Sequence, residues 1–353
     1  MTTLSAVKQG RAGPTGDDPT PAGPGWAKPL HRLRHHRQEL ILLLVLVAMT
    51  FLFAQLNPRF LSTAAAANIM QDFSPVLLTA VGQTFVIISG GIDLSVGSVL
   101  GLAGVICALT ARAANQAGLP TGAGIGLAVM AGIVTGLLVG LVNGLLVSRV
   151  KLAPFIATLA TMGAAYGTTL VVTNGVQIAG GPRAVILIGS KTYLGVFTAP
   201  VLVVLGVTAI AWLFLAKTRF GRYTYAIGSN RFAARVAGIG VKQHLVKVYL
   251  LSGVLAGLAG ILVYFRLGSG SPSSGQGGEL QAIAAAVIGG VSLAGGQGRL
   301  GGTILGAFII TAVISGLILI GVAPAWQQIV TGALIAVAVA VQAIGNPKRS
   351  VDL

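Results

Sequence analysis

Carboxylate groups are scarce in the long apolar part of this sequence, and they are the first candidates for a functional site. Between residues 74 and 345 the acidic residues are Asp93 and Glu279. A charge in an apolar environment is costly and usually serves a function. Asp93 follows two glycines and precedes an apolar run, which suits either a helix N-cap or a gate in a transport pathway. Glu279 opens another run, where an acid complements the helix dipole or faces an external partner.

Uncharged polar side chains near or within the apolar runs extend this candidate site. We expect Ser95, Asn143 and Thr158 to line a translocation pathway or gate together with Asp93. These residues offer hydrogen bonds, but they form no chain of acids that could relay protons. Their chemistry therefore disfavours a proton-driven carrier without excluding it.

Several kinds of chemistry have no matching residues in the sequence. The pattern Gly-x-x-x-x-Gly-Lys-Ser/Thr does not occur, so we expect no ATP site of that type on this chain. Three of the four histidines stand in the basic N-terminal segment and the fourth is His244, so we expect no metal centre. We predict no catalytic residue and no resident cofactor. Any driving energy must come from another subunit, which would bind the ATP, or from an ion gradient.

Composition places the chain in a membrane. Of its 353 residues, 54% are hydrophobic and 8% are charged, whereas soluble proteins carry about 25% charged residues. A soluble fold could not hide so much apolar surface, but helices that cross a bilayer can expose it to lipid. The net charge of +16 is spread between the apolar runs, which argues against a nucleic-acid partner. We predict an all-α, polytopic membrane protein in contact with lipid.

About ten membrane helices are predicted, because one span needs about 20 apolar residues. They fall at residues 40–56, 74–90, 94–111, 124–148, 153–173, 199–215, 246–266, 279–293, 300–321 and 324–344. We expect residues 57–73 to lie along the membrane interface. The transmembrane domain of residues 39–345 is expected between a basic, disordered cytoplasmic tail (1–38) and a second cytoplasmic tail (346–353).

The distribution of lysine and arginine predicts the orientation. With the N-terminus inside, 18 of the 23 basic residues fall on the inner side and five on the outer side. Inner loops of membrane proteins are enriched in these residues. We therefore expect both termini in the cytoplasm.

Two segments of the chain resemble one another. Residues 90–97 and 289–296 both read Gly-Gly, a β-branched residue, a short polar residue, leucine and a small residue. Transporters often arise by internal duplication, and chance similarity in a glycine-rich chain is the alternative. We predict two internally related halves. Glycines at four-residue intervals, such as those from Gly132 to Gly144, predict helix faces that pack closely.

The longest inner loop, residues 217–247, contains signals for a short helix. Asn230 suits an N-cap, the Ala-Ala-Arg sequence that begins at Ala233 suits a helix, and Gly238 suits its end. The loop is either a solvated linker or the docking element of a cytoplasmic motor subunit.

Several sequence blocks, taken together, carry a family resemblance. They are Gly-Gly-Ile-Asp-Leu-Ser-Val-Gly-Ser at residues 90–98, followed by residues 155–159, 173–175, 218–222, 279–280, 283–290 and 295–298, with Asn230, Ala234 and Arg235. In this order and spacing, over about residues 40–345, the chain resembles the permease subunit of bacterial ABC importers of the ribose, xylose, arabinose and galactose class.

This resemblance implies a complete machine with several partners in the bacterial inner membrane. It implies a second permease copy, a cytoplasmic ABC ATPase subunit that hydrolyses ATP, and a periplasmic or extracellular sugar-binding protein. The coupling helix would comprise Asn230, Ala233, Ala234, Arg235 and Gly238, and Glu279 would help to dock the binding protein. The chain departs from the family pattern at Arg231 and Phe232, where acids are common, and at Gln281, where aspartate is common.

The predicted function is therefore that of the non-catalytic, membrane-spanning subunit of an ATP-driven importer of a monosaccharide or similar polyol, working by alternating access. A related importer of nucleosides or branched-chain amino acids is one alternative. An ion-coupled secondary carrier is another, and a membrane-embedded enzyme is disfavoured because the sequence has no catalytic constellation.

Overall fold

The computed structural model describes the backbone of residues 27–345 and the side chains of residues 39–340. The chain divides into two units, residues 1–38 and residues 39–353. Helix α1 (Ala27–Leu56) begins within the first unit, whereas we expected a disordered tail up to residue 38. Leucine, arginine and glutamine are good helix formers, which accounts for this earlier start. The rest of that predicted tail, and the tail at 346–353, lie outside the described residues.

Helices make up nearly all of the described chain. Those long and apolar enough to cross a membrane are α1, α2 (Thr63–Ile88), α3 (Val96–Gln116), α4 (Thr121–Leu145), α5 (Pro154–Thr173), α7 (Ala199–Lys217), α10 (Val241–Leu267) and α12 (Leu300–Leu319). The remaining α-helices are α6 (Arg183–Ser190), α8 (Arg219–Ser229), α9 (Arg231–Val236), α11 (Gly278–Ile288) and α13 (Pro324–Gly345). The fold is an all-α polytopic membrane fold, as predicted.

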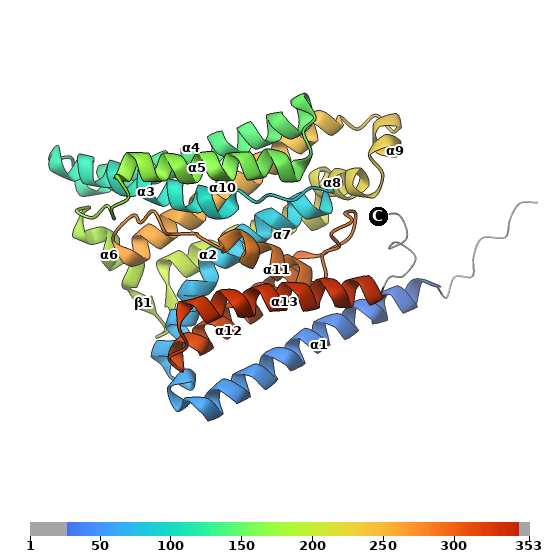
Figure 1. Cartoon of the computed structure of the whole chain (residues 1–353), viewed down its shortest axis with the longest axis horizontal. Coiled ribbons are helices and arrows are strands. Elements are labelled where there is room, and N and C mark those ends of the chain that lie inside the picture. Colours follow the sequence, from blue (N-terminus) through green and yellow to red (C-terminus); the bar gives the residue numbers. More distant parts are fainter. Residues whose placement is uncertain (1–26, 346–353) are drawn as a thin grey trace, which may run out of the picture. The chain divides into compact units, whose positions relative to one another are not determined.

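Short elements complete the description. A 3-10 helix η1 (Pro58–Leu61) precedes α2, and a π-helical turn η2 (Leu146–Val150) extends α4. Strands β1 (Thr192–Tyr193) and β2 (Phe197–Thr198) form a small antiparallel hairpin before α7. Within the unit of residues 39–353, α8 and α9 lie at one end of the helices, and α6 and β1 lie at the other (Figure 1).

All ten predicted spans are helical, but two predicted boundaries are wrong. Helix α2 starts at Thr63, because the Ser62 side chain accepts a hydrogen bond from Ala65 N and caps it there. Residues 63–73 therefore belong to α2 and not to an interfacial segment. The span predicted for 279–293 is α11, which ends at Ile288. Its 11 residues extend only about 16 Å, roughly half of a bilayer core.

Helices α2 and α11 end in the same way. Gly90 N donates to Ile87 O and Gly91 N to Val86 O, while Gly290 N donates to Val287 O and Val291 N to Ala286 O. This is the Schellman pattern, which requires positive φ, and Gly90 and Gly290 have φ of 80° and 86°. The structural correspondence is thus Gly90 with Gly290. The correspondence of the helix ends is one position away from the sequence match, which pairs residue 90 with residue 289. The relation between the two halves stays a prediction.

Helices α2 and α10 form the interior of the helical domain. Helix α10 lies against α2, α3 and α4, and most of α2 and α10 is buried, whereas most of α4 is not. The glycine face predicted on α4 is confirmed. Gly136 and Gly140 lie directly against the α10 backbone near Gly253, so that no side chain separates the two helices.

We predict that Gly136→Ala destabilises the helix pair. The added methyl group would overlap Gly253 O and Gly257 Cα, which are backbone atoms and cannot move aside without separating the helices. Overpacking of this kind costs about 1–3 kcal/mol. The thermal unfolding midpoint of the detergent-purified protein should fall.

Gly126→Ala is the matched control on the same helix. A methyl group there meets nothing within 4 Å in the described part of the chain, and alanine favours a helix over glycine by about 0.8–1.0 kcal/mol. This control should be neutral or stabilising, and equal midpoints for the two variants would contradict the close packing of α4 on α10.

Candidate functional site

The connection between α2 and α3 carries the predicted acid into the protein interior. After the Schellman turn at Gly90, the chain runs without helical hydrogen bonding until Val96, where α3 begins. Asp93 lies in this connection and is buried. Its carboxylate is therefore held by protein groups rather than by bulk water.

Three hydrogen bonds hold the Asp93 carboxylate. Oδ1 accepts from Ser95 N at 3.0 Å and from Ser95 Oγ at 2.6 Å. Oδ2 accepts from Ser252 Oγ of α10 at 2.8 Å. Burial raises the pKa of Asp93, and the hydrogen bonds from Ser95 and Ser252 act in the opposite direction.

The N-cap interpretation of Asp93 is wrong. The N-cap residue of α3 is Ser95, whose side chain makes no capping bond. Asp93 instead joins the α2–α3 connection to α10 through Ser252. This contact spans 159 residues of sequence, so it is a tertiary contact and not a local helix signal.

A chain of polar side chains continues from Ser95 into α4 and α5. Asn143 Nδ2 donates to Ser95 Oγ at 2.8 Å, and Thr161 Oγ1 donates to Asn143 Oδ1 at 2.6 Å. Thr158 Oγ1 contacts the backbone oxygen of Ile92 at 3.2 Å. The four residues predicted as a gate, Asp93, Ser95, Asn143 and Thr158, thus lie together in one buried cluster.

The sequence interpretation missed three members of this cluster. The side-chain amide of Gln83 on α2 is oriented to bond both polar groups of the Asp93 backbone. Its nitrogen donates to Asp93 O at 3.0 Å, and its oxygen accepts from Asp93 N at 3.3 Å. Thr161 and Gln83 are marked in the sequence as polar residues in apolar runs, so that signal could have included them. Ser252 has no comparable signal, because a serine beside glycines also suits simple helix packing.

The predicted helix in the inner loop is α9, and its predicted ends are confirmed. Asn230 caps it by accepting a hydrogen bond from Ala233 N at 2.9 Å. Gly238, with φ of 81°, follows the last turn, and its N–H donates to Arg235 O. Of the predicted coupling residues, Ala233, Arg235 and Gly238 are exposed, whereas Ala234 is buried against the rest of the fold.

Segments α8 and α9 contact the connections that follow α2 and α11. Arg231 Nη2 donates to Gly90 O at 3.0 Å, and Tyr225 Oη donates to Gly298 O at 2.7 Å. The two connections also touch each other, because Gly296 N donates to Ile88 O at 2.8 Å. Burial raises the pKa of Tyr225, although nearby Arg299 opposes the shift, so the phenol stays a hydrogen-bond donor at neutral pH.

Glu279 lies in the first turn of α11, where its carboxylate packs against Gly97 in the first turn of α3. Glu279 is partly buried, and within residues 39–340 the structure gives no hydrogen bond that joins its side chain to the Asp93 cluster. Its predicted role in docking an external protein stays a prediction.

Comparison with known proteins decides the family. Residues 65–339 match the family described as the permease component of the branched-chain amino acid transport system. The chain belongs to this permease family. It is therefore a component of a membrane transport system. No solved structure matches the chain.

Several relatives within this permease family are named for sugars. The chain is 42% identical to the ribose import permease protein RbsC of Bacillus subtilis over 86% of this chain and 92% of the relative. It is 36% identical to the D-allose transport system permease protein AlsC of Escherichia coli, over 84% and 89%. It is 35% identical to the fructose import permease protein FrcC of Rhizobium meliloti, over 88% and 87%. The resemblance stated from the motif blocks is confirmed.

We predict that Ser252→Ala lowers the thermal unfolding midpoint of the purified permease. The substitution leaves Asp93 Oδ2 buried without its partner, and an unsatisfied buried group costs about 1–3 kcal/mol, or more for a charge. Differential scanning fluorimetry in detergent measures the shift.

Ser148→Ala is the control, because Ser148 Oγ is also buried but has no hydrogen-bond partner among the described residues. Its removal should leave the midpoint unchanged or raise it. Equal shifts for both serine variants would show that the Asp93 cluster does not hold the helices together.

Proposed function

We propose that this chain is the membrane-spanning permease subunit of an ATP-driven, binding-protein-dependent importer of a monosaccharide or similar polyol. Relatives that match most of this chain are named for ribose, allose and fructose, and these names support the substrate class. The ATP would be bound and hydrolysed by a cytoplasmic ABC ATPase subunit, and the chain itself carries out no covalent chemistry.

The observation that best supports an ATPase partner is the surface of α9. Phe232 and Val236 are 76% and 73% exposed, although both are apolar. They stand four residues apart, so they share one face of the helix. Exposed apolar side chains on one short helix favour contact with another protein. We assign this face, with Asn230, Ala233, Arg235 and Gly238, to the ATPase subunit, while Ala234 anchors the helix to the permease.

The contacts beneath α9 offer a route for the coupling. A displacement of α9 acts on Gly90 O through Arg231, and Gly90 lies three residues before Asp93. The Asp93 cluster would then carry the displacement to α10 through Ser252 and to α4 through Asn143. In this proposal Asp93, Ser95, Asn143 and Thr158 form a gate because they make these helices move together between outward-open and inward-open states.

The remaining partners follow from the same proposal. A second permease copy would complete the pathway, and an external sugar-binding protein would deliver the solute, with Glu279 as the predicted docking residue. The lysine and arginine distribution supports an inner-membrane location with both termini in the cytoplasm.

The relatives named for ribose, allose and fructose favour the sugar importer over the two alternatives. The description of the family itself names branched-chain amino acids, and a nucleoside importer would share the same general architecture. An ion-coupled secondary carrier would need neither an ATPase nor a binding protein. Uptake that persists without the ATPase, and that a protonophore abolishes, would favour the carrier over the proposed importer.

We predict that the double variant Phe232→Ala/Val236→Ala uncouples the transporter. Permease, ATPase and sugar-binding protein are reconstituted in liposomes, and sugar-stimulated ATP hydrolysis is measured. Losing two exposed anchors should weaken the ATPase contact by several kcal/mol, since burying each such side chain contributes about 1.5–3 kcal/mol. Stimulation and copurification of the ATPase should both fall.

Leu194→Ala is the control for this experiment. Leu194 is also apolar and highly exposed, but it lies in the β1–β2 hairpin, at the other end of the helices from α9 (Figure 1). Its variant should keep full stimulation. Unchanged stimulation in the α9 variant, or in a variant with residues 230–238 replaced by a flexible linker, would contradict the assignment of α9 to the ATPase.

A further inference from the structure

A cavity of about 350 Å³ opens between α2 and α10, at the end of α10 opposite to α9. Its walls come from α2, α6, α7, α10 and the segment after α10. Arg266 stands 25 residues after Val241, the first residue of α10, which places it about 38 Å along the helix. The cavity is therefore far from the α8–α9 surface that we assign to the ATPase.

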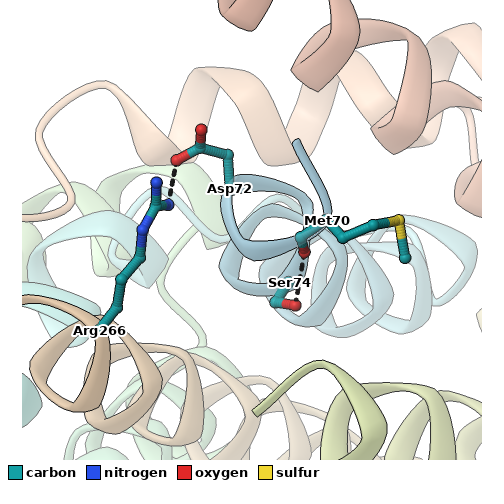
Figure 2. Close-up of polar contacts among 4 residues, drawn as sticks. All are labelled: Met70, Asp72, Ser74 and Arg266. Atoms are coloured by element: carbon teal, nitrogen blue, oxygen red, sulfur yellow. Dashed lines mark hydrogen bonds and ion pairs between the residues drawn. The ribbon is translucent and has the colours of Figure 1, made fainter. Parts of the chain in front are cut away.

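An ion pair forms the polar part of the cavity wall. Arg266 Nη1 on α10 contacts Asp72 Oδ1 on α2, and Figure 2 shows the two side chains directed toward one another from different helices. Within the described residues this is the single salt bridge. Charges within membrane helices are costly and usually mark a solute pathway.

Both charged side chains keep access to the cavity. The side chain of Arg266 is 28% exposed and that of Asp72 is 39% exposed, so the ion pair buries neither of them completely. A guanidinium group has five N–H donors and a carboxylate has two acceptor oxygens. Among the described residues the pair makes one contact, so most of this hydrogen-bonding capacity is available to a molecule in the cavity.

Neutral polar and apolar groups line the rest of the cavity. Gln71 and Ser74 of α2 line the same cavity. Ser74 Oγ already donates to Met70 O at 2.9 Å, which leaves its lone pairs to accept (Figure 2). Pro75 and Leu262 supply apolar surface. Small-molecule sites combine a mainly apolar wall with a few polar groups in this way, and their volumes start at about 300 Å³.

The chemistry of this wall fits a neutral polyhydroxy molecule. Each hydroxyl group both donates and accepts, so adjacent hydroxyls can donate to Asp72 while accepting from the guanidinium fork of Arg266. The contact between Asp72 and Arg266 cancels their charges. A bound ion would have to break that pair, whereas a hydroxyl group can bridge it.

We propose that the Asp72–Arg266 cavity is a monosaccharide contact site, in which the two charged side chains bind adjacent hydroxyl groups of the solute on its way through the permease. This inference rests on the proposed function and deepens it by assigning residues that meet the substrate. The site receives the sugar on the side opposite to the ATPase.

Substrate protection of an introduced cysteine tests the site in the complete transporter. Cys107 is the single native cysteine and is buried, so Gln71→Cys in a Cys107→Ala background provides a specific label position in the cavity. A membrane-impermeant maleimide is added on the side opposite to the ATPase, with D-ribose, D-allose, D-fructose or L-leucine. The sugar that the wild type takes up should slow labelling, and leucine should not.

Leu194→Cys in the same background is the labelling control, because Leu194 is exposed and lies outside the cavity. No sugar should protect it. Equal labelling at position 71 with and without the transported sugar, or protection by leucine as strong as by sugar, would overturn the proposal.

Uptake by charge variants separates a substrate contact from a structural ion pair. Asp72→Asn and Arg266→Gln should each lower uptake by about tenfold, the loss expected for one charged hydrogen bond. Lys191→Gln removes a cation that lies outside the cavity, beside Tyr193, and should leave uptake unchanged. All three variants should still copurify with the ATPase subunit, which checks that they fold and assemble.

The exchanged pair Asp72→Arg/Arg266→Asp completes the test. A purely structural pair would be restored by the exchange, so recovery of wild-type uptake would overturn the proposal, and continued loss supports it. If the wild-type transporter takes up no monosaccharide with ATP, the proposed function itself fails. If the wild type takes up a monosaccharide and every cavity variant takes it up equally well, only the proposed contact site is refuted.

Discussion

A buried carboxylate must find hydrogen-bond donors within the protein, and this requirement organises the centre of the permease. Asp93 takes its donors from Ser95 beside it and from Ser252 on α10. Ser95 in turn bonds to Asn143 of α4, which bonds to Thr161 of α5. Because each of these bonds requires a separation of about 3 Å, the helices can meet the requirement only if their backbones come close.

The glycine face of α4 makes that close approach possible. Gly136 and Gly140 lie against the backbone of α10, where a larger residue would push the helices apart. Apolar attraction between helices is weak in lipid, so packing and internal hydrogen bonds carry more of the association. The glycines and the Asp93 cluster therefore depend on one another: the first permits the distance that the second needs.

The two ends of the helical domain have different chemistry. At one end, α8 and α9 bond to the connections after α2 and α11 through Arg231 and Tyr225, and α9 exposes apolar side chains. At the other end, α2 and α10 hold the Asp72–Arg266 pair beside a cavity. Since α2 and α10 take part in both regions, a movement that starts at α9 has a continuous path to the cavity.

The sequence by itself determined the all-α membrane class, a helix at each predicted span although not every boundary, the capped helix at Asn230 and the four polar residues that join the Asp93 cluster. These features depend on local composition, helix caps and the cost of polar groups in an apolar chain, all of which can be recognised in a single segment. Only the tertiary structure decided that Asp93 bonds to Ser252, that Gln83 joins it, and that Asp72 meets Arg266. These partners are distant in sequence. The glycine spacing indicates which face of α4 packs closely, but which side chains meet depends on how the helices pack against one another.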